Sequence, residues 1–477
     1  MNRTAISPNM TGRRSSLTAK AGVMMISAIL LLSSLVLFQP SIATASTCST
    51  TYSASPTYDT ATMVPITITS TGTYCFGAGT YNTQITITAS GVTLTTAPGV
   101  RPGHAIIEPT TVASNSNNVP SGTPGYSIIL AGSDSASTTG VTISNLVVDG
   151  SKASSSITSC QSFPSGDYNG ILFLNAGGMI AGDTVQNMYL PVTVAASCQS
   201  PSTVRLQPGD GIVAMTGSGF SSSVTISSNQ VLNYENIGVL CIYAGTTCSI
   251  THNAVSDAGT PYSAFNAPTG IFINGAAGTV SRNIASGNNC TVASFCGVNV
   301  LTQVQATGII TVASGAGTTI EQNALIGNDG GIATFYDTTT SSNNQLQGNK
   351  VFGLDVYDGA STVSNNQISG SSDIGIAVDS DGCFDGPTTA NLMGNNFNQG
   401  TYSIAPVQVS TISDPAYCTA NYGGPSYQEP ATVNLNGFVE TVSGGTLGSC
   451  APLGPCPYPS SLSVVNLNDF PGFHSPP

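Results

Sequence analysis

An apolar residue, an asparagine three places later and a second apolar residue two places after that recur seven times along this chain. Six of the seven are followed by a glycine that begins an apolar, β-prone stretch, as at Gly238, Gly270 and Gly331. Self-similarity at about 20–30 residues predicts a solenoid, in which each repeat buries its apolar side against its neighbours. The seven motifs are Ile226/Asn229/Val231, Ile250/Asn253/Val255, Val280/Asn283/Ala285, Ile320/Asn323/Leu325, Leu346/Asn349/Val351, Val363/Asn366/Ile368 and Leu392/Asn395/Phe397.

Helical periodicity is almost absent after the first 45 residues. Short runs rich in Val, Ile and Thr alternate with Gly, Asn, Ser and Asp, which is typical of strands and turns. Each repeat has room for two or three very short strands, so a β-sandwich fits poorly. The pattern predicts an all-β, right-handed parallel β-helix of short strands, with coils about 4.8 Å apart, an asparagine turn, end caps and lateral loop insertions.

The turn asparagines have a physical role in such a fold. Asparagine tolerates left-handed backbone conformations, and its amide can hydrogen-bond to the equivalent residue in the coils above and below. With this asparagine series, residues 60–400 resemble the right-handed β-helix superfamily that includes pectate lyases and polygalacturonases. The resemblance implies an asparagine ladder along one turn and an extracellular polysaccharide as partner.

The first 45 residues have the order of a secretory signal peptide. Basic residues precede an apolar run from Ala21 to Phe38, and small residues follow at Ala43–Ala45. We expect cleavage near Ala45 and secretion of the remaining chain. The alternative is an uncleaved membrane anchor, because the run approaches the length that spans a bilayer.

Charge narrows the possible partners. The chain has 9 basic and 22 acidic residues, and cleavage would remove four of the basic ones, leaving a formal charge of −17. Nucleic acid is excluded as a partner, because binding it requires a basic surface. A polyanionic glycan such as pectate is disfavoured for the same reason, unless calcium bridges the two.

All twelve cysteines lie after the signal segment, and an even number in an exported chain indicates disulfides. Proximity favours Cys241/Cys248, Cys290/Cys296 and Cys450/Cys456, and sequential pairing would add Cys48/Cys75, Cys160/Cys198 and Cys383/Cys418. The alternative is that some are buried free thiols, with Cys241 the first candidate because it lies in an apolar strand.

Four long insertions precede glycine-led strands, at Ser151–Asn169, Ala181–Asp210, Asp257–Thr269 and Ser286–Thr307. If they share one edge of the solenoid, they wall a groove, because insertions gathered on one side of a repeat usually mark the binding side. Ordinary loop padding without a ligand is the alternative.

Acidic residues also recur just before the glycine strands, including Asp210, Glu235 and Asp329. Carboxylates one or two coils apart would be about 5–10 Å from each other, which brackets the separations in glycosidases. We therefore expect acid/base catalysis to use a pair among these three residues. The alternative is that Asp and Asn before Gly simply form turns.

A second acidic group suggests calcium. Asp337, Asp358 and Asp379 are spaced by 21 residues, and Asp379, Asp381 and Asp385 form a close set of oxygen ligands. The glycines before these strands are spaced by 22, so the two registers disagree by one residue and one aspartate is expected to face differently. Solvated turn aspartates are the alternative.

Glycan binding usually needs aromatic platforms, and Trp is absent. The candidates that could stack on sugar rings or pack an insertion are Tyr234, Tyr243, Tyr262, Phe265, Phe272, Phe335, Tyr336 and Tyr357.

The sequence predicts three parts: a signal peptide at 1–45, a β-helix with its N-terminal cap at 46–400, and a C-terminal cap with an irregular tail at 401–477. The leading function is binding or cleavage of a neutral or weakly charged extracellular polysaccharide by a monomer, with hydrolysis favoured over lyase chemistry. The rival is a non-catalytic surface or matrix protein that adheres or scaffolds.

Overall fold

The structure is a computed structural model. It describes residues 47–55, 57–118, 123–157, 168–189, 191, 194, 209–257, 268–290, 306–314, 317–380, 387–397, 400–411, 431–435, 438–442, 449–450 and 454–455. Met1–Ala45 forms a unit separate from Ser46–Pro477, and the predicted signal segment lies outside the described residues. Among the described helices, none is long and apolar enough to cross a membrane.

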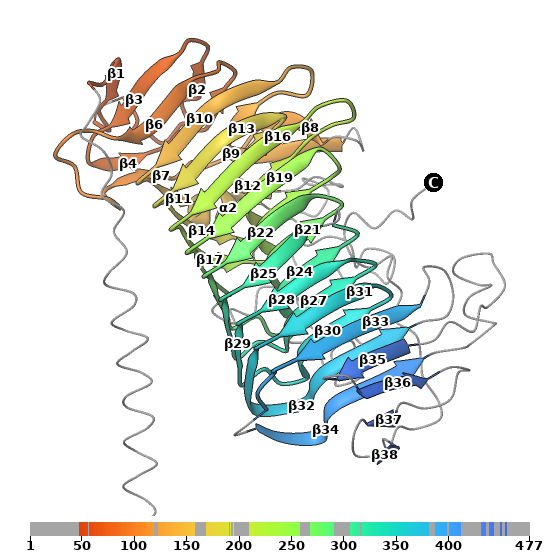
Figure 1. Ribbon diagram of the computed structural model, residues 1–477. Helices are drawn as coiled ribbons and strands as arrows, with labels where there is room; N and C mark the ends of the chain where they lie inside the picture. The colour runs from red at the N-terminus through yellow and green to blue at the C-terminus, as the bar shows by residue number, and fades with distance from the viewer. Residues whose placement is uncertain are drawn as a thin grey trace, which may run out of the picture. The chain divides into compact units, whose positions relative to one another are not determined.

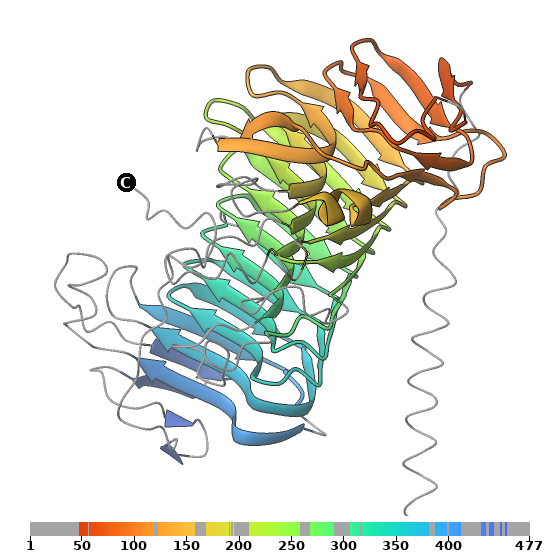
Figure 2. The same cartoon turned by 180° about the vertical axis from the view of Figure 1, so that it is seen from behind.

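The described chain winds through three sheets of short strands, which we call sheets A, B and C (Figure 1). Each full coil passes from sheet C to sheet B and then to sheet A, and equivalent strands of successive coils pair in parallel. The view from behind shows the same continuous stack (Figure 2). The predicted all-β parallel β-helix is therefore confirmed.

Sheet A contains β1 (Thr50–Tyr52), β3 (Gly72–Phe76), β6 (Val92–Thr96), β10 (Thr138–Ser144), β13 (Ala176–Ala181), β16 (Ser222–Ser227), β19 (Thr246–Thr251), β22 (Ala277–Ser281), β25 (Thr318–Glu321), β28 (Thr339–Ser342), β31 (Ala360–Ser364), β33 (Thr388–Met393), β35 (Ala431–Leu435) and β36 (Phe438–Val442).

Sheet B contains β2 (Ile66–Ile68), β5 (Ile85–Ile87), β8 (Ser114–Asn118), β9 (Thr123–Gly132), β12 (Tyr168–Leu174), β15 (Gly209–Met215), β18 (Ile237–Ile242), β21 (Thr269–Asn274), β24 (Thr307–Val312), β27 (Gly330–Phe335), β30 (Phe352–Tyr357), β34 (Gly400–Thr411), β37 (Ser449–Cys450) and β38 (Gly454–Pro455). Sheet C contains β4 (Gly79–Tyr81), β7 (Ala105–Ile107), β11 (Val147–Asp149), β14 (Thr184–Met188), β17 (Gln230–Tyr234), β20 (Ala254–Ser256), β23 (Ile284–Ser286), β26 (Ala324–Ile326) and β29 (Gln345–Gln347). The long β32 (Gln367–Ser380) passes from sheet C into sheet B, and the short helix α2 (Ser151–Ser156) follows β11.

Columns of apolar side chains fill the interior. In sheet B the inward position of seven successive coils is fully buried, and the strand register stacks its residues directly on one another. Full burial of each such side chain contributes about 1.5–3 kcal/mol. The column consists of Ile212, Val239, Ile271, Ile309, Ile332, Leu354 and Ile376.

The outward face of sheet B is also apolar and buried, unlike a sheet with one solvated face. Leu172, Val213, Leu240, Phe272 and Ile310 follow one another on this face and form a second apolar cluster. Strands buried on both faces have near-continuous apolar sequences, which explains why these stretches show no clean alternation. Phe272 faces outward, as its position in the strand predicts.

The glycine near the start of each sheet B strand from β12 to β30 is required by close approach at the corner between sheets C and B. A Cβ on Gly211 would lie 2.4 Å from Cγ1 of Val231 and 2.5 Å from the carbonyl oxygen of Gly238. Such contacts would force the coils apart, so only glycine fits. The recurring glycine thus reflects packing between sheets.

An asparagine ladder occupies the turn from sheet A to sheet C, as the resemblance implies. In each rung the side-chain oxygen accepts hydrogen bonds of 2.9–3.0 Å from the backbone N–H and the amide of the preceding rung. The rungs are Asn229, Asn253, Asn283, Asn323, Asn344, Asn366 and Asn395.

One assignment from the sequence is wrong. Asn349 belongs to a second, shorter ladder with Asn288 and Asn328, in the turn from sheet C to sheet B. The rung predicted for Asn349 is occupied by Asn344 instead. The motif at Leu346 matches by spacing alone, because its apolar residue lies in sheet C rather than sheet A.

The left-handed backbone conformation falls on the residue before each rung, not on the asparagine itself. Ser228, His252, Arg282 and Gln322 have φ values of 57–59°, whereas the rungs that follow them do not have positive φ. The ladder asparagines therefore contribute through their buried amides. The left-handed φ expected at these asparagines is found instead at the residue before each of them.

Two disulfides predicted from the sequence are present, Cys48–Cys75 and Cys241–Cys248. The free-thiol alternative for Cys241 is therefore wrong. Its bridge to Cys248 joins β18 and β19 across the tight turn between them. Cys290 is also disulfide-bonded. The remaining predicted pairs include cysteines that lie outside the described residues.

Parallel stacking extends beyond both limits suggested by the repeat. β1 already pairs with β3 in sheet A, and β34 and β35 continue sheets B and A after residue 400. The antiparallel strand β36 then pairs with β35 and ends the parallel series in sheet A. Weak sequence similarity in the terminal coils explains why the motif alone does not reveal them.

Replacing Asn323 with Leu should destabilise the fold by about 3 kcal/mol or more, because two buried donors of Asn283 would lose their acceptor. Chemical denaturation of the variant measures the loss. Gln347→Ala, at an exposed position of sheet C, is the matched control and should leave stability nearly unchanged. Equal stability of Asn323→Leu and the unsubstituted protein would refute a structural role for the ladder.

Asp183 takes the ladder position that precedes Asn229, and its Oδ1 accepts a 2.8 Å hydrogen bond from the Leu146 N–H. Burial raises the pKa of this carboxyl to about 8. Its Oδ2 has no hydrogen-bond partner among the described residues, and it lies where the other rungs carry an NH2 group. The protonated acid can therefore stand in for an amide.

Because the folded pKa of Asp183 exceeds the unfolded value of about 3.9, the folded chain holds a proton that the unfolded chain releases. This contribution to stability is complete below about pH 4 and is lost as the pH rises to about 8, at most about 1.4 kcal/mol per pH unit. Asp183→Asn should remove this dependence in denaturation experiments between pH 4 and 8. Asp59→Asn, an exposed control, should retain it. An unchanged pH profile in Asp183→Asn would contradict the assignment.

Candidate functional site

The four insertions share one edge of the solenoid. They connect β11 to β12, β14 to β15, β20 to β21 and β23 to β24, so each leads from sheet C into sheet B. This is the clustering that the groove hypothesis requires, although residues 158–167, 195–208, 258–267 and 291–305 lie outside the described part of the chain. Any site associated with the insertions therefore borders sheet B.

Asp210 and Glu235 lie on neighbouring coils at this edge. Both are buried, with Asp210 1 % and Glu235 0 % exposed. Asp210 Oδ1 accepts hydrogen bonds from the Asn236 amide at 3.0 Å and the Ile237 N–H at 3.1 Å. These contacts fix the first residues of β18 against β15.

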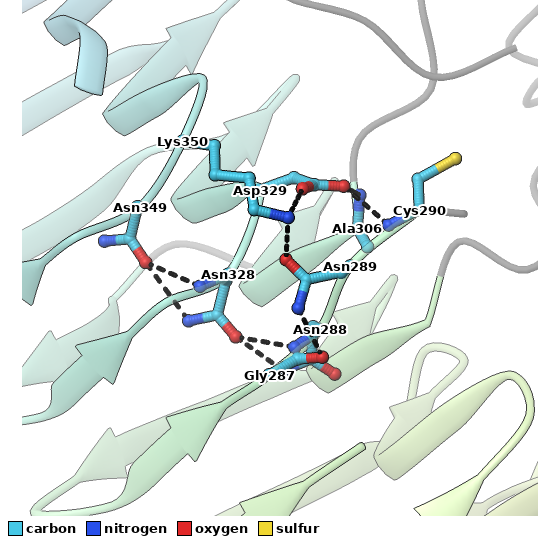
Figure 3. A network of polar contacts seen from close by, with 9 residues as sticks. All are labelled: Gly287, Asn288, Asn289, Cys290, Ala306, Asn328, Asp329, Asn349 and Lys350. Carbon is cyan, nitrogen blue, oxygen red and sulfur yellow. Dashed lines mark hydrogen bonds and ion pairs between the residues drawn. The ribbon is translucent and has the colours of Figure 1, made fainter. Parts of the chain in front are cut away.

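Asp329 lies further along the same edge, where it joins the two ends of one insertion (Figure 3). Its Oδ2 accepts a 2.6 Å hydrogen bond from the Cys290 N–H and a 3.5 Å one from the Ala306 N–H. Lys350 Nζ lies 3.3 Å from Oδ1 of Asp329 and donates a 2.6 Å hydrogen bond to Asn289 Oδ1. The network connects residues on both sides of the insertion.

The three predicted catalytic acids do not form one group. Three strand pairings, β18 to β21, β21 to β24 and β24 to β27, separate the coil of Glu235 from that of Asp329. At about 4.8 Å a coil, the separation is about 14 Å along the stack. Only Asp210 and Glu235 remain as neighbours.

The predicted aspartate column is out of register by one residue, as the sequence analysis expects. Asp379 pairs with Tyr357 and faces outward from sheet B, while Asp358 N–H donates to the Asp379 carbonyl. Asp337 accepts hydrogen bonds from the Ser314 hydroxyl and the Thr338 N–H, and burial raises its pKa.

The calcium set remains a prediction. Asp381 and Asp385 lie outside the described residues, so only Asp379 of this set can be placed. Among the residues that the structure describes, no group of three His, Cys, Asp or Glu side chains could hold a metal ion.

The acid that sequence reasoning missed is Asp355 in β30. It lies in the outward column of sheet B, with Ala333 on one side and Ala377 on the other. It is 1 % exposed, and its Oδ1 has no hydrogen-bond partner in the part of the chain that the structure describes. Burial first, and then the neighbouring carboxyl of Asp379, raise the pKa of Asp355 well above its usual value.

A signal for Asp355 existed in the sequence. It is the only acid in the stretch Gly353-Leu-Asp-Val-Tyr357, whose other residues are apolar, aromatic or glycine. Because an isolated buried carboxyl is costly, its presence in an apolar strand points to a function.

Aromatic rings adjoin the two carboxyls. Phe335, Tyr357 and Asp379 pair in one row across β27, β30 and β32. The ring centroids of Phe335 and Tyr357 are 5.5 Å apart, and those of Tyr336 and Tyr357 are 6.2 Å apart. Phe335 and Tyr336 remain partly exposed. We call Asp355, Asp379, Phe335, Tyr336 and Tyr357 the carboxyl–aromatic face.

Comparison with known proteins supports the fold. Residues 210–397 match the family described as the right-handed β-helix region, which confirms the predicted superfamily resemblance for that part. The described part of the chain thus has the right-handed parallel β-helix fold. A comparison with curated protein sequences finds no match.

Several solved structures are similar at low identity. The A-module of mannuronan C-5 epimerase AlgE4 from Azotobacter vinelandii has 15% identity and a TM-score of 0.39, covering 72% of this chain and 91% of its own. An alginate lyase from Paenibacillus sp. str. FPU-7 has 13% identity and a TM-score of 0.33, covering 71% and 90%. The Dettilon tailspike protein has 12% identity and a TM-score of 0.34, covering 74% and 61%. At these values no residue role or activity is transferred to this chain.

Asp329→Ala should destabilise the protein more than Lys350→Met does. The carboxylate bonds the buried edge through the Cys290 N–H, whereas Lys350 is 60% exposed, and exposed ion pairs contribute about 0–1 kcal/mol. Loss of the hydrogen bond to Cys290 should cost about 1–3 kcal/mol. Thermal melting of both variants tests this, and an equal or larger effect of Lys350→Met would show that the ion pair dominates.

Proposed function

We propose that this protein is exported and binds an extracellular polysaccharide on the carboxyl–aromatic face, where it hydrolyses a glycosidic bond. The observation that carries the proposal is the pair Asp355 and Asp379, two carboxyls on adjacent strands of a mainly apolar outward face. Burying two carboxyls is unfavourable in free energy, and such pairs are found mainly at functional sites.

The spacing of the pair suits glycoside hydrolysis. Asp355 and Asp379 lie on neighbouring strands and are offset by two residues along the strand. With strands about 4.8 Å apart and a rise of about 3.3 Å per residue, their Cα atoms are about 8 Å apart. Carboxyl groups in glycosidases are about 5–9.5 Å apart.

The environments of the two carboxyls favour different roles. Burial, and then the neighbouring Asp379, raise the pKa of Asp355 well above its usual value, which favours the form that carries a proton. Asp355 would donate that proton to the oxygen of the leaving sugar, while the carboxylate of Asp379 activates water or attacks the sugar ring.

The aromatic side chains give the sugar a surface. Phe335 and Tyr336 are partly exposed beside Tyr357, and such rings bind the apolar faces of sugars. The shared edge of the four insertions borders the same sheet, which supports binding of an extended chain there.

A second candidate is the pair Asp210 and Glu235, on adjacent coils at the edge between sheets C and B. The hydrogen bonds that Asp210 accepts from Asn236 and Ile237 favour a structural role for it. Asp329, held to Cys290 and Lys350, is a weaker candidate for the same reason.

The test is incubation of the full chain with a polysaccharide panel, with and without calcium. New reducing ends report hydrolysis, and absorbance of unsaturated sugar reports lyase chemistry. We expect reducing ends, and Asp355→Asn or Asp379→Asn should lower kcat at least about 100-fold without unfolding the protein. Asp210→Asn and Asp329→Asn should retain turnover.

Three outcomes would oppose this proposal. Turnover that survives Asp355→Asn but is lost in Asp210→Asn would move the site to the second candidate. Unsaturated product would mean a lyase. Absence of binding and turnover across the panel would favour the rival function, a non-catalytic surface or matrix protein.

A further inference from the structure

The charge on sheet B has one sign. The strands of this sheet that the structure describes contain Asp210, Asp355, Asp373 and Asp379, and none of them contains Lys, Arg or His. Two of these acids belong to the carboxyl–aromatic face. A bound glycan would therefore meet carboxyls, aromatic rings and aliphatic side chains, but no basic residue from these strands.

The lysine closest in sequence to the face is already engaged. Lys350, two residues before β30, contacts Asp329 at 3.3 Å and Asn289 at 2.6 Å. Both partners belong to the edge between sheets C and B. Using Lys350 to neutralise an anionic ligand would require breaking both contacts, so it does not balance the charge of Asp355 and Asp379.

A polyuronate or a sulfated glycan would bring further negative charge to this face. Like charges cost more as water is excluded, and the buried Asp355 and Asp379 are already close enough to interact with each other. No group of opposite sign on the described strands offsets this cost. Anionic polysaccharides therefore fit this face poorly.

A cation fits better than a neutral group. Among the described residues, the buried Asp355 Oδ1 has no hydrogen-bond partner, so an acceptor is available beside Asp379. An ammonium group offers three donors and a positive charge, so it could donate a hydrogen bond to Asp355 Oδ1 and pair with the carboxylate of Asp379. The acidic chain as a whole, with 22 acidic and 9 basic residues, would also attract a cationic polymer.

We infer that the glycan bound on the carboxyl–aromatic face is cationic, a polymer of amino sugars with free ammonium groups, and that Asp355 and Asp379 recognise one of these groups. This inference rests on the proposed function. The inference adds to the proposed function the charge class of the substrate.

The test is calorimetric binding of three oligosaccharides of equal length at about pH 6, below the pKa range of amino groups. The first carries free amines (glucosamine), the second N-acetylated amines and the third carboxylates (galacturonate). We expect the glucosamine oligomer to bind at least about ten-fold more tightly than the acetylated one, with an affinity that falls as salt is added. The galacturonate oligomer should not bind measurably.

Substitution assigns the preference to the face. Asp379→Asn should reduce the advantage of the glucosamine oligomer over the acetylated one to about two-fold or less. Asp59→Asn, an exposed acid outside sheet B, is the matched control and should keep the full preference. A preference that persists in Asp379→Asn would come from the overall negative charge and would overturn the inference.

Failure of the inference can be distinguished from failure of the proposed function. Equal binding of the free and acetylated oligomers, with hydrolysis that still requires Asp355, would refute the cationic substrate and leave the hydrolase proposal intact. Tight binding of galacturonate would refute the inference directly. Lack of binding by all three oligomers would contradict both.

Discussion

A buried column of asparagine amides determines how one coil sits on the next. Each rung satisfies a backbone N–H and an amide of its neighbour, at distances of 2.9–3.0 Å in the ladder from Asn229 to Asn395. Because a buried donor without a partner costs about 1–3 kcal/mol, the ladder penalises any slip in register. The apolar columns in the interior supply most of the stabilisation. Because apolar contacts are not directional, the amides determine the register between successive coils.

The corner between sheets C and B depends on that registration. Only glycine fits where the strand of one coil crosses the side chains of sheet C, as at Gly211 and Val231. The sheet B strand that follows each glycine therefore has a fixed position along the stack, and equivalent outward residues of successive strands form straight columns. Asp355 and Asp379 are brought together by this regularity, since each belongs to a column whose other members are mainly apolar. The candidate site is therefore a local exception within a strict repeat.

Acids at the edge and acids on the face differ in their surroundings. Asp210 and Asp329 accept backbone hydrogen bonds, which hold neighbouring segments in place. Asp355 lies between two alanines, and no described residue forms a hydrogen bond with its Oδ1. A carboxyl that bonds the backbone contributes to folding, whereas one without such bonds is available for a ligand. This contrast is the reason for placing the chemistry on the carboxyl–aromatic face.

The sequence by itself determined the stack. The spacing of Asn229, Asn253 and Asn283 predicts the ladder, the apolar stretches after the glycines predict the strands, and insertion lengths predict a shared edge. Tertiary structure alone decided which residues face each other. Asn349 and Asn344 compete for one rung by spacing, and strand pairing assigns it to Asn344. Likewise, a shift of one residue turns a side chain to the opposite face of a strand. The partnership of Asp355 with Asp379 therefore emerges only when the register between β30 and β32 is known.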